Sequence, residues 1–200
     1  MALVIEDEYL PATLTARPMP DEEFAELCAN YPDHFIEMTA EGEIVITPPN
    51  YTFTSAQSGE ILGQLGNWAR SDKRGLVTDT PAGFVLPTGA RRSPDAAWIP
   101  KDRLRAMDPK HLKQFWHLCP PFVIEVKSTW DRHPKFRAKM QEWIDNGAEL
   151  AWLVDPERRA VEVYRPQQEP DVREGIDSIA AVPPVEGFTL NLAPVWDPIA

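Results

Sequence analysis

Two apolar runs with an amphipathic segment between them constrain the fold of this chain more than any other feature. Residues 121–128 and 150–154 are short and apolar, as is typical of buried strands. Residues 134–146 between them place apolar side chains at helical spacing and stop before a glycine: Phe136, Met140, Trp143 and Ile144, then Gly147. Strand, helix and strand in this order predict a right-handed parallel crossover. We therefore expect an α/β protein in which helices flank a central mixed β-sheet.

The first of these runs carries two charged residues inside its apolar sequence. Side chains alternate between the faces of a strand, so Val123, Glu125 and Lys127 are expected on one face. A carboxylate and an ammonium in a buried strand are costly unless each has a partner. A structural ion pair would satisfy both groups, and so would a catalytic site.

A second carboxylate favours the catalytic alternative. Residues 91–99 predict a strand that carries Asp95 directly after Pro94. Two carboxylates from neighbouring strands form an oxygen site that suits Mg²⁺, with Mn²⁺ as an alternative ion. Such a metal polarises a phosphodiester and acidifies a water, while a nearby lysine stabilises charge or positions that water. We expect the carboxylates of Asp95 and Glu125 to converge with the Lys127 ammonium at one end of the sheet.

The rest of the chain predicts a single domain with a short arm and tail. We expect an N-terminal arm over residues 1–19, one domain over 20–195 and a tail over 196–200. Within the domain, alternating apolar residues on either side of Glu41-Gly42 predict a β-hairpin over 35–47. A long helix is expected from about residue 55 to residue 70.

Composition limits the class of partner. The acidic N-terminus lacks the basic start of a signal peptide, and no apolar run approaches the roughly 18 residues of a membrane span, so we expect a cytoplasmic protein with no membrane partner. The net charge of −11 is unfavourable for nucleic acid, but residues 91–139 hold 12 Lys and Arg against 5 Asp and Glu. That segment carries +7 and the remainder −18, so the expected site lies in the basic part of the chain.

The motifs together resemble the Uma-two family of restriction endonuclease-like proteins, a branch of the PD-(D/E)XK nuclease superfamily. The resemblance covers roughly residues 20–195. It is carried by Pro94-Asp95, by the strand over 122–128, by Lys139, Trp143 and Gly147 spaced four apart, by residues 152–158 and 161–164, and by Gly187-Phe188 with Leu190. It implies a restriction-endonuclease-like core and a metal-dependent endonuclease acting on DNA.

The resemblance also implies roles for individual residues. Asp95 and Glu125 would bind the metal, together with the backbone carbonyl of Val126. Many relatives have an aliphatic residue in place of Lys127, and their lysine matching Lys139 substitutes for it; this chain has both. Because Lys127 is two residues from Glu125, it is expected to be the more important lysine, with Lys139 reaching the site from a helix edge.

Two other functions are compatible with the sequence. One is a nuclease-fold module that binds or assembles without cutting, which the net acidity favours. The other is a metal-dependent hydrolase of a smaller phosphoester. A homodimer is compatible with cutting both strands of a duplex, because that reaction calls for two sites.

Overall fold

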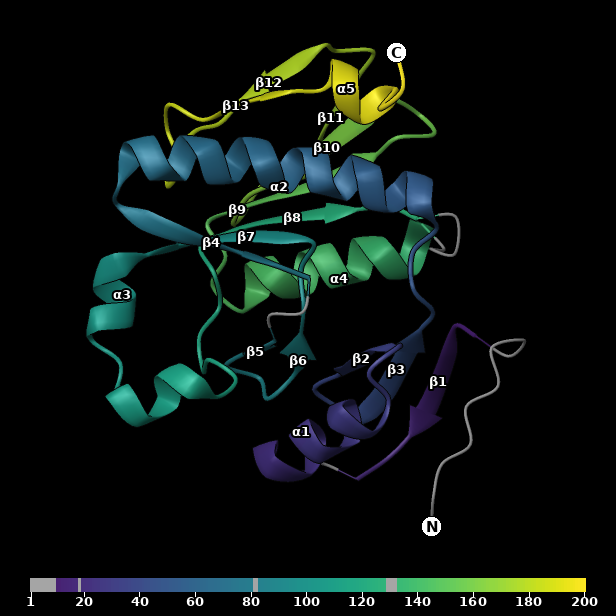
Figure 1. Ribbon diagram of the computed structural model, residues 1–200, viewed down its shortest axis with the longest axis vertical. Helices are drawn as coiled ribbons and strands as arrows, with labels where there is room; N and C mark the ends of the chain where they lie inside the picture. Colours follow the sequence, from purple (N-terminus) through teal and green to yellow (C-terminus); the bar gives the residue numbers. More distant parts are fainter. Residues whose placement is uncertain (1–9, 18, 81–82, 129–132) are drawn as a thin grey trace.

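A six-stranded mixed sheet forms the centre of the computed structural model, which describes residues 10–17, 19–80, 83–128 and 133–200 (Figure 1). In spatial order its strands are β11 (Asp171–Glu174), β10 (Ala160–Tyr164), β9 (Leu150–Asp155), β8 (Phe122–Val126), β7 (Ala96–Pro100) and β4 (Gly75–Asp79). Only β8 and β9 run parallel, and every other neighbouring pair is antiparallel. The predicted parallel crossover is therefore confirmed.

Two helices cover the faces of this sheet. Helix α2 (Thr52–Asp72) lies on one face and α4 (His133–Asp145), which connects β8 to β9, lies on the other (Figure 1). The predicted apolar stripe of α4 packs against alternate residues of β7, β8 and β9 in one core cluster: Ala97, Ile99, Val123, Ala151 and Leu153. Gly147 ends the helix with a φ of +110°, a conformation that costs a glycine little.

A second sheet packs beside α4 and contains the predicted hairpin. In spatial order it comprises β1 (Ala12–Thr15), β3 (Glu43–Thr47), β2 (Phe35–Met38), β6 (Arg91–Arg92) and β5 (Phe84–Val85). Helix α1 (Asp21–Asn30) covers it through Phe24, which belongs to the same core cluster as Ile36, Met38, Ile44 and Ile46. Residues 12–15, expected in the arm, therefore form an edge strand of this sheet.

Shorter elements complete the described chain. They are α3 (Lys101–Arg105), the 3₁₀ helix η2 (Pro109–Lys113), the two-stranded sheet of β12 (Ser178–Ala180) and β13 (Thr189–Asn191), and α5 (Ala193–Trp196). None of the helices in the described ranges is long and apolar enough to cross a membrane.

One detail differs from the sequence-based expectations. The strand predicted over 91–99 is divided between two sheets, because the chain leaves β6 and enters β7 through residues 93–95, where Pro94 lacks a backbone donor.

Candidate active site

The register of β7 against β8 brings the two predicted metal ligands together. Ala96 lies opposite Ile124, and Asp95 directly precedes Ala96, so Asp95 comes next to the end of β8 that carries Glu125. Glu125 shares the face of Val123, which α4 covers. The Asp95 carboxylate is close enough for its charge to act on that of Glu125.

Backbone and hydroxyl donors hold the Asp95 carboxylate. Its Oδ2 accepts a hydrogen bond of 2.7 Å from the backbone N–H of Val126. Its Oδ1 accepts a weaker one of 3.3 Å from the hydroxyl of Thr80, in the turn after β4. Because Val126 directly follows Glu125 in β8, the bond from its N–H holds the Asp95 carboxylate at the end of β8 that carries Glu125.

Helix α4 supplies two donors to one oxygen of Glu125. Trp143 Nε1 donates to Oε1 over 2.8 Å, and Lys139 Nζ lies 2.8 Å from the same oxygen. Lys139 and Trp143 are one turn apart on α4, so one helix face presents both donors. Glu125 is 2% exposed.

Glu37 of β2 is a further member of the site that the sequence analysis missed. Its Oε1 lies 3.0 Å from Lys139 Nζ and accepts a bond of 2.9 Å from the N–H of Ser93. Its Oε2 lies 3.2 Å from Arg92, whose Nε is 2.6 Å from Glu142. A glutamate at an alternating position of a hairpin strand resembles a solvent-facing residue, so its spacing gave no signal of this role.

Lys127 lies beside Asp155 and Glu157 and not beside Glu125. Its Nζ is 3.2 Å from Asp155 and 3.2 Å from Glu157, and these are its ion-pair partners among the described residues. The physical reason is that the parallel register of β8 and β9 continues one residue past β8 and brings Lys127 next to Asp155, the last residue of β9, whose carboxylate pairs with the ammonium. Its N–H continues the pairing to Val154, and its side chain turns toward the end of β9. The structure therefore places Lys139, and not Lys127, beside Glu125.

The charges in this cluster shift the pKa values of three groups. Burial raises the pKa of Glu125 to about 8, with the charges of Asp95 and Glu37 adding to the effect and Lys139 opposing it. Burial also acts to raise the pKa of Glu37, but Lys139, Arg92 and the Ser93 N–H outweigh it, and this pKa is lowered. For Lys139 burial acts to lower the pKa, and the carboxylates of Glu125 and Glu37 reverse that and raise it. Glu37 and Lys139 therefore stay charged at neutral pH, and Glu125 is the member that takes up a proton.

The side chains of the site offer a metal ion two carboxylate ligands and not three. Within the described part of the chain, no three His, Cys, Asp or Glu side chains form a group that could hold a metal. Asp95 and Glu125 lie at the same end of β8. Oxygen ligands of this kind suit a divalent cation such as Mg²⁺.

Comparison with known proteins identifies the family of the chain and a similar fold. Residues 21–193 match the Uma2 family, which is described as "putative restriction endonuclease". The fold is similar to the crystal structure of a "putative nuclease belonging to DUF820" from Anabaena variabilis, with a TM-score of 0.66 and 21% identity. The similarity covers 80% of this chain and 89% of that one. No curated protein matches the chain.

Proposed function

Since the chain belongs to the Uma2 family of putative restriction endonucleases, we propose that it is a metal-dependent endonuclease that hydrolyses phosphodiester bonds of DNA. One observation carries the proposal: Asp95 is bonded to the residue that follows Glu125 in β8, and the Lys139 ammonium lies 2.8 Å from the Glu125 carboxylate. Carboxylates from neighbouring strands with a lysine beside them are the groups that metal-assisted phosphodiester hydrolysis needs.

The charge balance of the cluster supports a divalent ion. When all its groups are ionised, it holds four carboxylates and two cations: Asp95, Glu125, Glu37 and Glu142 against Lys139 and Arg92. The balance of −2 equals the charge that one Mg²⁺ or Mn²⁺ would neutralise. We propose Asp95, Glu125 and the carbonyl of Val126 as its protein ligands. A bound metal would polarise the phosphodiester and acidify a water.

The surrounding residues orient the groups that react. The Val126 N–H holds Asp95 and the Trp143 indole holds Glu125, so each carboxylate keeps one orientation. Lys139 remains protonated because of the carboxylates beside it, so it acts as a fixed cation that stabilises charge developing on the phosphate and not as a base. Lys127 neutralises the fully buried Asp155 and has a structural role.

The raised pKa of Glu125 predicts that metal binding depends on pH. Only the ionised carboxylate binds Mg²⁺, so the apparent affinity should fall about tenfold for each pH unit below about 8. Titration calorimetry in buffers of different ionisation enthalpy at pH 6, 7 and 8 would measure this. Close to one proton should be released for each metal bound at pH 7. An affinity that is constant between pH 6 and 8 would contradict the assignment of Glu125 as a ligand.

Glu37 is expected to matter because it fixes the lysine. Glu37→Gln keeps the shape of the side chain but removes the charge between Lys139 and Arg92. Breaking a buried pair of this kind costs about 3 kcal/mol of unfolding free energy, and a displaced Lys139 should slow cleavage by about one to two powers of ten. Glu43→Gln, on the exposed side of the same hairpin, is the matched control and should leave both values unchanged. Urea unfolding and cleavage rates of the two variants would test this prediction.

A plasmid assay tests the proposed function directly. The protein should nick supercoiled DNA in Mg²⁺ or Mn²⁺ and should be inactive in EDTA. Metal binding without nicking, together with hydrolysis of a small phosphodiester such as bis-p-nitrophenyl phosphate, would indicate the smaller-substrate hydrolase. Absence of metal binding and of both activities would indicate a binding module. Sedimentation of the active species would show whether two copies supply the two sites needed for duplex cleavage.

A further inference from the structure

A cavity of about 490 Å³ lies beside the candidate active site and has no role in the chemistry described above. Helix α1, strands β4 and β5 and the segment after η2 surround it. Its apolar walls include the rings of Phe84, Phe115 and Trp116. Its polar lining comprises Thr78, Lys113 and Gln114 together with two carboxylates of α1, Asp21, which is paired with Arg91, and Glu22. A concave site with flat apolar walls and a few polar groups is typical of a small-molecule site.

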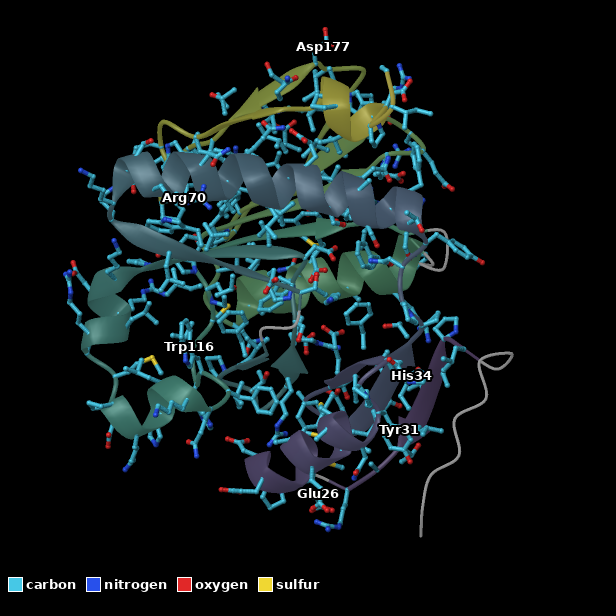
Figure 2. The ribbon with its side chains drawn as sticks, in the orientation of Figure 1. Glu26, Tyr31, His34, Arg70, Trp116 and Asp177 are labelled. Atoms are coloured by element: carbon cyan, nitrogen blue, oxygen red, sulfur yellow. The ribbon has the colours of Figure 1, made fainter. Side chains whose placement is uncertain are left out.

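The aromatic walls are held in fixed orientations. The rings of Phe84 and Trp116 meet nearly edge to face, with centroids 6.3 Å apart. Trp116 Nε1 donates to the carbonyl of Leu112, which fixes the orientation of the indole. Figure 2 labels Trp116, where the segment after η2 meets β5. Phe115 lies so close to Gly83 that a Cβ there would come within 2.5 Å of its ring.

One polar atom in the wall lacks a partner. Thr78 Oγ1 is buried and has no hydrogen-bond partner among the described residues. Burying a hydroxyl without a partner is unfavourable. A ligand that supplied a donor or an acceptor at this point would satisfy the hydroxyl.

The sheet register connects this cavity to the carboxylates. Thr78 lies opposite Ala97, which is on the same face of the sheet as Asp95 two residues earlier. Thr80, two residues after Thr78, donates to Asp95. Two residues of a strand span about 7 Å. Thr78, in the wall of the cavity, therefore lies about that far from Thr80, whose hydroxyl donates to the proposed metal ligand Asp95.

We propose that this cavity binds one nucleobase of the substrate, unstacked from its neighbours, close to the phosphate that is cut. The inference rests on the proposed function and adds the substrate class: a nucleic acid with an unpaired or readily unpaired base at the cutting position. Aromatic faces bind an unstacked base, and hydroxyl and amide groups bind its polar edge. Thr78 and Gln114 supply such groups, and Lys113 lies at the same cavity for the adjoining phosphate.

Nucleotide binding without catalysis tests this proposal. Adenosine 5′-monophosphate is titrated in EDTA, with tryptophan fluorescence and calorimetry as the readouts and ribose 5-phosphate as the control ligand. The nucleotide should quench fluorescence and bind, and ribose 5-phosphate should do neither. Thr78→Val is nearly isosteric and should weaken nucleotide binding about five- to tenfold, the factor expected for one hydrogen bond. Because it removes an unpartnered hydroxyl, it should keep or raise the midpoint of thermal unfolding. Thr189→Val, on the exposed side of β13, is the matched control.

The outcomes separate this inference from the proposed function. Equal binding of the two ligands, or unchanged nucleotide affinity in Thr78→Val, overturns the base site even if the protein cuts DNA. Glu125→Gln should bind the nucleotide like the wild type, since Glu125 does not line the cavity. Single-stranded or mismatched oligonucleotides should be cut with a lower KM than matched duplex. The same KM for both would also overturn the proposal.

Discussion

Glu125→Gln should lower the rate of DNA cleavage by at least about a thousandfold, or about 4 kcal/mol in the activation barrier. The substitution keeps an oxygen that can accept the bonds from Lys139 and Trp143, but it removes the charge that would bind the metal. Initial rates of plasmid nicking in saturating Mg²⁺ would measure the effect. Titration calorimetry would show whether metal affinity is lost with the rate.

The same variant should change how stability depends on pH. The pKa of Glu125 is raised to about 8 in the folded protein, above its ordinary value of 4.5. Between these values the folded state holds a proton that the unfolded state has lost, so the stability of the wild type falls as pH rises. Glu125→Gln should flatten that fall, as measured by urea unfolding at pH 5, 6.5 and 8. Glu149→Gln, an exposed position next to β9, should behave as the wild type in every assay. Full cleavage by Glu125→Gln would exclude the site.

The two lysines should give opposite results when each is replaced by methionine. Lys139→Met removes the ammonium that touches Glu125 and Glu37, and cleavage should fall by about two to three powers of ten. Lys127→Met leaves the buried Asp155 without its cation, which should cost about 3–5 kcal/mol of unfolding free energy. Its cleavage rate, measured well below its unfolding temperature, should remain within about threefold of the wild type.

Rates and unfolding curves for both variants at one temperature would decide between the lysines. Lys135→Met, an exposed position on the first turn of α4, controls for removing a positive charge from this region. A folded Lys127→Met that does not cut, next to an active Lys139→Met, would restore Lys127 as the lysine of the site. Loss of cleavage in all three variants would point to general electrostatic binding of DNA.

The central crossover could be predicted because two independent patterns agree there. The apolar runs of β8 and β9 are short and nearly uninterrupted, and the stripe of α4 has a clear helical period that stops at Gly147. The position of Asp95 at the start of a strand could be predicted from Pro94 before it and from the apolar residues 96–99 after it. The division between β6 and β7 could not be predicted, because the sequence of residues 91–99 is compatible with one continuous strand.

The neighbourhood of Asp95 and Glu125 could be predicted because Glu125 lies in β8 and Asp95 directly precedes β7, the strand beside it. The partner of Lys127 could not be predicted, because the sequence does not show that Asp155 of β9 lies next to it. Glu37 was missed because its partners, Lys139 and Arg92, are distant in sequence and come from other elements. Contacts of that kind depend on how two sheets dock, which periodicity does not encode.

The ion pair between Glu37 and Lys139 joins the second sheet to helix α4 on the central sheet, and this has a consequence for the order of folding. Contacts between distant parts of a chain form late, because their loop-closure entropy must be paid first. A chain whose central sheet has formed before the hairpin docks would hold Asp95 and Glu125 together but would leave Lys139 without Glu37. Such an intermediate could bind a metal before it could cut. The nascent protein would therefore acquire nuclease activity only with its last tertiary contacts.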